Sequence, residues 1–303
     1  MRTVYMGTSE FAVRVLRRLA DSPHRPALVV APPDRPQGRG RRTAPPPVAD
    51  ASSELGLELL QTESVNRDDG VARIRAAAPE LGVVCAFGQL IREPLLSELP
   101  MLNVHPSLLP RWRGAAPIER AIMAGDRETG VTIIRVSAGY DSGPIALREA
   151  VSIEPGEGYG SLADRLADLG GELIVRALDL AAAGELEFAE QDESEATYAE
   201  KLAPEERRLD PSRPAVELER TVRALNPHLG CYLELEGGER LAVRAAVAED
   251  SQAKPGRLLA EGGALRLGCG EGWLRLELVQ PAGGRPMPAD AYLRGRGVPQ
   301  LAR

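Results

Sequence analysis

The sequence predicts an α/β protein with a Rossmann-like, doubly wound, mostly parallel sheet, followed by a small OB-like β-barrel. Two observations predict the sheet. Thr3 to Met6 reads as a strand that runs through a single-glycine turn into an amphipathic helix. Residues 81–87 are almost wholly apolar, as parallel strands buried on both faces tend to be. The barrel is predicted by five short strands after residue 230, separated by glycine-containing turns.

Composition places the chain among ordinary globular proteins. Its 303 residues suit two domains, and 43% are hydrophobic and 27% charged. The net charge of −7 disfavours a general nucleic-acid binder, although a local arginine cluster could still contact a phosphate backbone. The three cysteines are far apart, so neither a disulfide frame nor a cysteine zinc site is indicated. No apolar run approaches the about 18 residues that span a bilayer, and no signal core begins the chain. We therefore expect a cytoplasmic protein, not bound to a membrane, and a monomer.

Strands and helices alternate through the rest of the first domain. We expect strands over 27–31, 57–60, 101–104, 130–137 and 145–153, and helices over 48–55, 70–78, 118–124 and 160–183. The acidic residues 190–195 read as an exposed linker. A helix over 216–225 then precedes the barrel strands 231–235, 240–248, 256–260, 264–267 and 273–279. The predicted domains are 1–189 and 210–303, with a linker over 190–209.

A long segment rich in Pro, Gly and Arg, 32–47, has no apolar periodicity and is expected to be a loop. Loops longer than about 12 residues in a compact domain are usually functional or disordered. Two interpretations are open. The segment is a solvated insertion, or its arginines at 35, 39, 41 and 42 form a flexible cationic arm that contacts phosphate or RNA.

The most informative stretch surrounds Asn103 and His105. Successive side chains of a strand point to opposite faces, so these two project on one face and Val104 on the other. Pro106 cannot donate to a strand ladder and ends the strand directly after the histidine. In open α/β sheets, ligands bind at the carboxyl ends of strands. Asp141 lies in a glycine-flanked turn at another strand end, where an isolated aspartate is usually a turn former.

These motifs together resemble the methionyl-tRNA formyltransferase family from end to end. The matching segments are Gly7 to Ala12, Pro33 to Gly40, Asn103 to Ile118, Asp141 to Gly143, Arg223 to Pro227 and Gln280 to Met287. The segment that begins at Asn103 is, by itself, typical of any 10-formyltetrahydrofolate transferase. The insertion at 32–47 and the C-terminal domain restrict the resemblance to methionyl-tRNA formyltransferases. Gly284 departs from the family, which usually has a lysine there.

The resemblance implies a formyltransferase fold, with catalysis in 1–189, a tRNA-contacting loop at 32–47 and a tRNA-binding domain at 210–303. The implied reaction transfers formyl from 10-formyltetrahydrofolate, the co-substrate, to the amino group of methionyl-initiator tRNA, for initiation of translation. Such acyl transfer needs donors aimed at an oxyanion and an acid/base near neutral pH, and it requires no metal. Asn103 and His105 supply donors, and an Asp141 that reaches the imidazole would orient it and favour its protonated form.

The resemblance also implies binding residues. The catalytic set is Asn103, His105 and Asp141. The implied folate contacts are Phe87, Gly88, Gln89, Leu90, Ile91, Ser107, Leu108, Pro110, Gly139 and Tyr140. The implied tRNA contacts are Arg35, Arg39, Arg41 and Arg42. For Ser107, a turn-capping role remains an equal alternative to substrate contact.

Three other functions are less consistent with the sequence. Formylation of a small amine, such as a glycinamide nucleotide or an amino sugar, would leave the arginine-rich insertion and the barrel without a purpose. An RNA-binding module on a decayed catalytic scaffold is disfavoured by the intact polar set at 103, 105 and 141. A nicotinamide oxidoreductase is disfavoured because the first turn has one glycine and lacks the dinucleotide fingerprint G-x-G-x-x-G.

Overall fold

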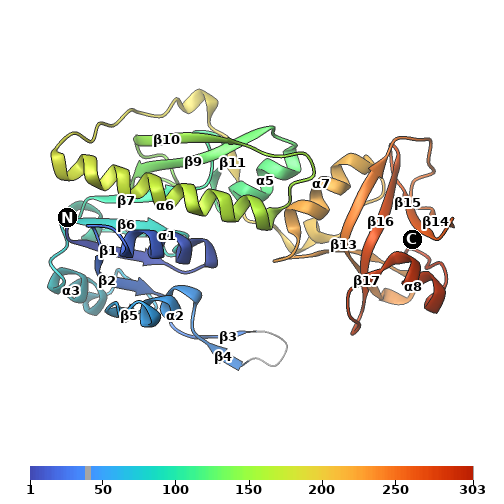
Figure 1. Ribbon diagram of the computed structural model, residues 1–303, viewed down its shortest axis with the longest axis horizontal. Helices are drawn as coiled ribbons and strands as arrows, with labels where there is room; N and C mark the ends of the chain where they lie inside the picture. Colours follow the sequence, from blue (N-terminus) through green and yellow to red (C-terminus); the bar gives the residue numbers. More distant parts are fainter. Residues whose placement is uncertain (38–41, 303) are drawn as a thin grey trace. The chain divides into compact units, whose positions relative to one another are not determined.

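The first compact unit is built on a seven-stranded sheet in the order β10-β9-β7-β6-β1-β2-β5, seen in the computed structural model of Figure 1. The unit comprises Met1–Pro117, Glu128–Ser152 and Ala163–Ala199, and the structure describes residues 1–37 and 42–302 of the chain. Its elements are β1 (Thr3–Gly7), α1 (Glu10–Ala20), β2 (Pro26–Ala31), β3 (Arg35–Gln37), β4 (Arg42–Ala44), α2 (Pro47–Glu54), β5 (Leu59–Gln61), α3 (Asp68–Ala76), β6 (Leu81–Cys85), α4 (Leu95–Glu98), β7 (Met101–His105), β8 (Arg113–Gly114), β9 (Glu128–Arg135), β10 (Ile145–Ser152), α6 (Tyr159–Ala183, of which residues from 163 on belong here) and β11 (Tyr198–Ala199).

Five neighbouring strands of this sheet, β7 to β5, run parallel, and β9 and β10 add an antiparallel edge. On one face α6 packs so closely that a Cβ at Gly170 would lie 2.8 Å from Cγ1 of Val104. On the other face, Val71 and Ile74 of α3 and Leu95 of α4 share a core with the strands. Helices therefore cover both faces, and the predicted doubly wound, mostly parallel sheet is confirmed.

The segment 32–47 is not the strand-free loop that its composition indicates. Residues 35–37 and 42–44 pair as the antiparallel strands β3 and β4, with Pro36 opposite Thr43. The prediction was wrong because a two-stranded hairpin has no buried face, so no apolar alternation marks it. Pro36 is tolerated because both strands of an isolated hairpin are edge strands.

The second compact unit is built from antiparallel strands. It comprises Ile118–Arg127, Ile153–Leu162 and Glu200–Arg303. Its elements include α5 (Pro117–Ala124, from residue 118 on), α7 (Ala215–Leu225), β12 (Cys231–Glu234), β13 (Arg240–Glu249), β14 (Leu258–Glu261), β15 (Ala264–Gly268), β16 (Trp273–Pro281), β17 (Met287–Pro288) and α8 (Ala289–Arg296). The five longer strands pair in the order β12-β13-β16-β15-β14, and the predicted small domain of five antiparallel strands is confirmed. The helix α8 was not predicted.

The core of this unit lies between the sheet and two helices. Leu218 and Val222 of α7 and Tyr292 of α8 are buried together with strand residues such as Val243 and Leu276. Two register shifts in the pairing of β13 with β16 mark irregularities, and such bulges increase the local bend and twist of a sheet. A strongly bent five-stranded sheet is what a small barrel-like domain requires.

Glu249, at the end of β13, joins two arginines of the neighbouring strands. Its Oε2 accepts from Arg266 Nε and its Oε1 from Arg275 Nε, each at 2.7 Å. The hydrogen bond from Arg266, followed by that from Arg275, holds the pKa of the Glu249 carboxyl below its ordinary value of 4.5. Because the folded-state pKa is the lower one, this stabilisation is complete at neutral pH and disappears as the pH falls through the lowered pKa.

We expect Glu249→Gln to lower the thermal unfolding midpoint by about 2 °C near pH 7, because it removes the charge that both guanidiniums face. The difference from wild type should shrink as the pH falls from 7 through the lowered pKa, because the wild-type carboxyl then becomes protonated as well. Thermal unfolding followed by circular dichroism across this range tests the prediction. A difference that does not change with pH would show that Glu249 stabilises by packing alone.

The predicted linker, 190–209, is partly built into the first unit. Gln191 is only 9% exposed, and residues up to Ala199 belong to that unit, while Glu200 begins the second. β11 pairs in parallel with β8. The reading of 190–195 as wholly exposed is therefore wrong at Gln191, since one polar side chain in a charged run can be buried without altering its composition. The predicted domain boundaries remain a prediction.

Within the part of the chain that the structure describes, no helix combines the length and apolar character needed to cross a membrane. The three cysteines are unpaired and buried, and burial raises the pKa of the Cys85 thiol to about 12. A thiolate nucleophile is therefore not expected at Cys85 near neutral pH, and the residue packs as a small buried hydrophobe.

Candidate active site

The strand β7 presents Asn103 and His105 on one face of the sheet and Val104 on the other, as their spacing predicts. Val104 is buried against α6, whereas Asn103 is half-buried and the His105 side chain is 4% exposed. The apolar side chains at 101, 102 and 104 are buried, and the strand ends at His105, directly before Pro106. The two polar side chains are thus fixed at the carboxyl end of a parallel strand.

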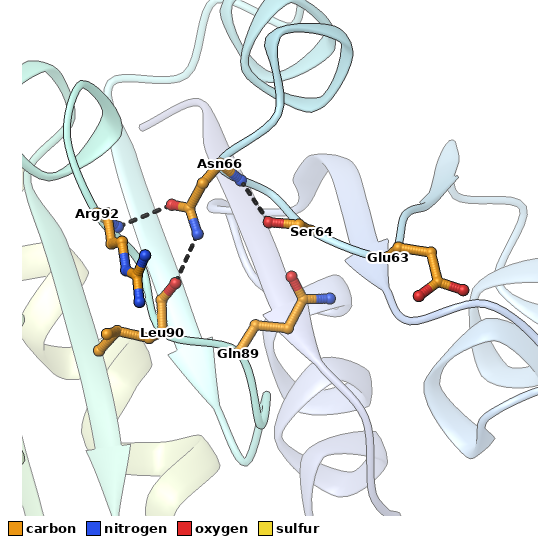
Figure 2. A pocket seen from close by; sticks show the side chains of 6 residues that line it. All are labelled: Glu63, Ser64, Asn66, Gln89, Leu90 and Arg92. Atoms are coloured by element: carbon orange, nitrogen blue, oxygen red, sulfur yellow. Dashed lines mark hydrogen bonds between the residues drawn. The ribbon is translucent and has the colours of Figure 1, made fainter.

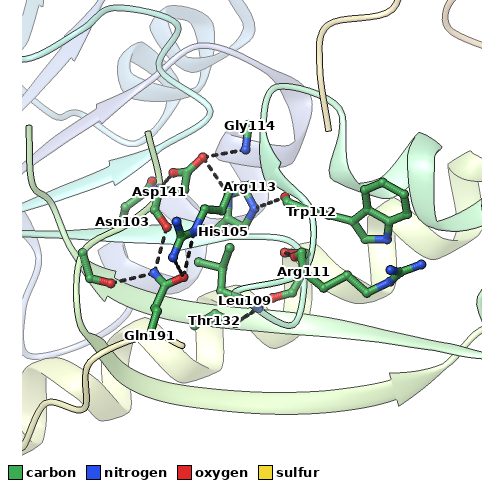
Figure 3. Close-up of polar contacts among 12 residues, drawn as sticks. Asn103, His105, Leu109, Arg111, Trp112, Arg113, Gly114, Thr132, Asp141 and Gln191 are labelled. Carbon is green, nitrogen blue, oxygen red and sulfur yellow. Dashed lines mark hydrogen bonds and ion pairs between the residues drawn. The ribbon is translucent and has the colours of Figure 1, made fainter. Parts of the chain in front are cut away.

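The carboxylate of Asp141 lies against both of these side chains (Figure 3). Its Oδ1 accepts a hydrogen bond from Asn103 Nδ2 at 3.0 Å, and its Oδ2 accepts one from the backbone N–H of Gly114 at 3.0 Å. The same Oδ2 lies 3.5 Å from His105 Nδ1. The three residues of the predicted catalytic set are therefore in one place, although 141 is far from 105 in sequence.

Both ring nitrogens of His105 face acceptors. Nε2 lies 2.9 Å from the backbone oxygen of Trp112, and Nδ1 faces the Asp141 carboxylate. A carbonyl oxygen can only accept, so this contact assigns a hydrogen to Nε2. The imidazole is thereby held between the loop after β7 and the Asp141 turn.

The turn that carries Asp141 requires glycine at 143. Asp141 itself has a φ of +48°, a conformation that aspartate tolerates better than most residues. A Cβ at Gly143 would lie 1.8 Å from the backbone oxygen of Arg135, so a larger residue there would displace the turn and its carboxylate. A Cβ at Gly139 would lie 2.3 Å from Oγ of Ser142, a side-chain atom that can rotate away.

Two residues next to Asp141 were not singled out from the sequence. Gln191 donates to the backbone oxygen of Asp141 at 2.8 Å, and it accepts from the buried guanidinium of Arg113 (Figure 3). Arg113 belongs to the motif that carries the family resemblance, but nothing in its position indicates a partner 78 residues away. Gln191 lies in an acidic run whose composition indicates a linker, and no sequence signal identifies it.

The predicted folate contacts after β6 lie beside the first strand of the sheet. Phe87 and Ile91 are buried in the core beneath the loop, and Oγ1 of Thr8 donates to the backbone oxygen of Phe87 at 2.8 Å. Gly88 has a positive φ. Leu90 and, in the Asp141 turn, Tyr140 expose 44% and 75% of their surface, so both offer apolar area to a ligand.

The remaining predicted folate contacts follow β7 or precede Asp141. Pro110 is buried, Leu108 is half-buried and Gly139 is exposed. Ser107 is fully buried and its hydroxyl donates to the backbone oxygen of Arg111 at 2.6 Å. This bond favours the turn-capping alternative for Ser107 over substrate contact.

A hollow of about 310 Å³ lies beside the loop after β6 (Figure 2). It is lined by Glu63, Ser64, Asn66, Gln89, Leu90 and Arg92. The Gln89 amide accepts from Val65 N at 2.9 Å and donates to Thr62 O at 3.0 Å, so it ties the loop to the segment after β5. Gln89 and Leu90, both predicted folate contacts, thus border an open polar hollow.

The predicted tRNA contacts are only partly described. Arg35, in β3, is exposed, and the backbone of Arg42 belongs to β4. Arg39 and Arg41 lie outside the described residues. Arg35 therefore presents its guanidinium to solvent, close in sequence to the other predicted tRNA contacts.

Comparison with known proteins identifies the class. Residues 1–178 match the family model described as formyl transferase, and residues 201–297 match that of the formyl transferase C-terminal domain. The fold is also similar to that of the N-formyltransferase from Helicobacter canadensis, solved with folinic acid and dTDP-3-aminofucose. That similarity has a TM-score of 0.67 at 12% identity, over 91% of this chain and 98% of the other. The chain is therefore a formyl transferase.

Closer relatives define the family within that class. The chain is 45% identical over 296 residues to the methionyl-tRNA formyltransferase of Pseudomonas paraeruginosa, covering 96% of this chain and 95% of that protein. It is 42% identical over 306 residues to the methionyl-tRNA formyltransferase of Ruegeria pomeroyi, covering 100% of both. The chain belongs to the methionyl-tRNA formyltransferase family, and the family predicted from the sequence is confirmed.

Proposed function

We propose that this chain transfers the formyl group of 10-formyltetrahydrofolate to the α-amino group of methionyl-initiator tRNA, in the cytoplasm, where translation begins. The observation that carries the proposal is the meeting of Asn103, His105 and Asp141 at the end of β7, within a chain of this family. An amide donor beside an imidazole and a carboxylate suits acyl transfer to an amine.

The proposed reaction is direct. The neutral amine attacks the formyl carbon, a carbon–nitrogen bond forms, and the formyl oxygen becomes an oxyanion. The bond from that carbon to N10 of the folate then breaks, and N10 takes up a proton while the attacking nitrogen loses one. The products are the formylated amine and tetrahydrofolate, so the balance requires no further reactant.

Each residue of the set has a distinct part in this proposal. Asn103 Nδ2 carries two hydrogens, of which one is directed at Asp141 and the second can be directed at the oxyanion. Nε2 of His105 carries its hydrogen towards the Trp112 oxygen, so Nδ1 is the ring nitrogen that takes the proton from the attacking nitrogen. Asp141 orients the imidazole, and the 3.5 Å separation of Nδ1 and Oδ2 closes in the reacting complex, as catalytic contacts of free enzymes often do.

We propose that the ring system of the formyl donor, 10-formyltetrahydrofolate, lies between the loop after β6 and the Asp141 turn. Phe87 to Ile91 and Tyr140 supply backbone groups and exposed apolar surface there. The Helicobacter canadensis enzyme, solved with a folate compound, has a similar fold. The test is binding of 10-formyltetrahydrofolate to wild type and to Leu90→Ser, whose affinity should fall because an exposed apolar contact is removed.

We propose that the arginines of segment 32–47 contact tRNA phosphates. The double variant Arg39→Ala/Arg41→Ala should raise the KM for methionyl-tRNA about tenfold and leave the KM for the folate unchanged, because two cationic contacts are lost. Steady-state formylation kinetics measure both constants. Arg73→Ala/Arg75→Ala, in the exposed part of α3, is a matched control that removes the same charge. Equal KM changes in the two double variants would refute a local contact.

The acceptor is tested by competition in one vessel. The protein is incubated with 10-formyltetrahydrofolate and equal amounts of methionyl-initiator tRNA, a glycinamide nucleotide and an amino-sugar nucleotide. Mass spectrometry then identifies the formylated products. The proposal predicts formylated methionyl-tRNA as the dominant product, whereas formylation of a small amine in preference to it would replace the proposed substrate.

A further inference from the structure

Gln191 uses its whole side-chain amide in bonds around the Asp141 turn. Its Nε2 donates to the backbone oxygens of Asp141 at 2.8 Å and of Gly143 at 2.7 Å. Its Oε1 accepts from Nε of Arg113 at 3.0 Å and from Nη2 at 2.8 Å (Figure 3). Both hydrogens and both lone pairs of a glutamine amide are therefore engaged, at a residue that is 9% exposed.

Arg113 connects this set of contacts to Glu193 and, through the residue that follows it, to the Asp141 carboxylate. Its guanidinium is 2% exposed and is also held by Glu193, with Nη1–Oε2 and Nη2–Oε1 distances of 2.9 Å and 2.8 Å. The hydrogen bond from Arg113 lowers the pKa of the Glu193 carboxyl, so that partner is ionised near neutral pH. The residue after Arg113 is Gly114, whose N–H donates to the Asp141 carboxylate. One short strand, β8, thus contacts the Asp141 carboxylate directly and holds the amide that binds the Asp141 backbone.

The Asp141 turn is a place where such support is needed. A non-glycine residue with a φ of +48° is held in its conformation by surrounding contacts, since the isolated chain rarely adopts it. The backbone oxygens at 141 and 143 are bound by Gln191, while the carboxylate is bound by Asn103 and Gly114. The turn is therefore fixed from both its backbone side and its side-chain side.

We propose that Gln191 is a positioning residue that holds the Asp141 carboxylate against Asn103 and His105, with Arg113 fixing the orientation of its amide. The inference rests on the proposed function, in which Asp141 works with His105. Glutamine suits this position because it donates to two carbonyls and accepts from a guanidinium at once. A glutamate would keep the contact with Arg113 but face both carbonyl oxygens with an acceptor, and a methionine would keep the length and lose every hydrogen bond.

The kinetic test compares Gln191→Glu and Gln191→Met with wild type. Both variants should lose about a hundredfold in kcat, because a displacement of about 1 Å in a reacting group has that effect. The KM values for methionyl-tRNA and folate should stay within about twofold, since no substrate contact is removed. Glu172→Gln, the reverse exchange of acid and amide at an exposed residue of α6 in the first unit, is the control and should match wild type.

A second readout needs no substrate. The chain has three histidines, at 24, 105 and 228, so ring signals from histidine-labelled protein can be assigned by single replacements. In Gln191→Met, the ring signals of His105 should shift and broaden while those of His24 and His228 stay in place. A general loss of stability would not single out one histidine.

The two readouts separate the inference from the function on which it rests. If wild type does not formylate methionyl-tRNA but the His105 signals shift as expected, the proposed function fails and the positioning role stands. Unchanged His105 signals in a folded Gln191→Met variant overturn the role, as does a kcat within about twofold of wild type in both variants. If circular dichroism shows that Gln191→Met is unfolded, Gln191→Asn, which keeps both amide functions on a shorter stem, is subjected to the same two tests and the same criteria.

Discussion

The Asp141→Asn variant is expected to lose three to four orders of magnitude in kcat, roughly the effect of replacing the buried aspartate of a Ser-His-Asp triad. The change is isosteric, but Asp141 accepts hydrogen bonds at both oxygens, from Asn103 Nδ2 and from Gly114 N–H. An asparagine has one acceptor oxygen, so its amide nitrogen would face one of these donors. The charge opposite His105 Nδ1 is lost as well.

Rapid-quench measurement of a single turnover tests this prediction, with the unfolding midpoint of the variant measured in parallel. Glu172→Gln, which makes the same exchange of a carboxylate for an amide at an exposed residue of α6, serves as the control. A folded Asp141→Asn variant that turns over at a rate near that of wild type would remove Asp141 from the reaction and leave it as a turn former.

His105→Ala is expected to have the second largest effect, a loss of about two to four orders of magnitude in kcat, the range for a removed acid/base group. The variant also removes the hydrogen bond from Nε2 to the backbone oxygen of Trp112, and the loss of one such bond costs about 0.5–1.5 kcal/mol of stability. The loss of kcat and the loss of stability have different causes, so a second variant can separate them. His105→Gln retains a donor of similar reach, so it should recover stability but not kcat.

Measurements of kcat and of the thermal unfolding midpoint for both His105 variants show whether stability recovers without kcat. His228→Gln, in the second unit, is the matched control, and its kcat should stay within about twofold of wild type. Recovery of kcat together with stability in His105→Gln would assign His105 a purely structural role.

The sequence predicts the geometry of β7 because its cause is local. The alternation of strand side chains places Asn103 and His105 together, and a proline ends the strand. The apolar run over 81–87 and the glycine-punctuated strands after 230 are local signals too. They locate β6 and the five strands of the second unit within a few residues.

The features that the sequence does not predict either depend on contacts between distant segments or carry no apolar pattern. Gln191 and Arg113 are 78 residues apart, and neither alone differs from an ordinary surface residue in its neighbourhood. Among the side chains of β3 and β4 that the structure describes none is buried, and the segment shows no apolar pattern. The helix α8 has a mixed sequence in which two residues, Ala289 and Tyr292, are buried, too few for a helical period to be visible.

The predicted folate contacts also divide into features that follow from the local sequence and features that depend on the path of the loops. The burial of Phe87 and Ile91 follows from the apolar character of their segment. The role of Gln89 in binding the segment after β5, and the bond from Ser107 to Arg111, arise from the path of the loops. Loop paths are set by backbone conformation at positions such as Ala86 and Gly88, which a pattern of residue types does not specify.

The most direct test of the account follows the formyl group itself. Wild-type protein in excess is mixed with methionyl-initiator tRNA and 10-formyltetrahydrofolate labelled in its formyl carbon, and the reaction is quenched at successive times. The label is expected to pass from the folate to the methionyl amine without appearing on protein, and this transfer should be slowed by orders of magnitude in Asp141→Asn. Label bound covalently to the protein, or transfer at the wild-type rate in that variant, would contradict it.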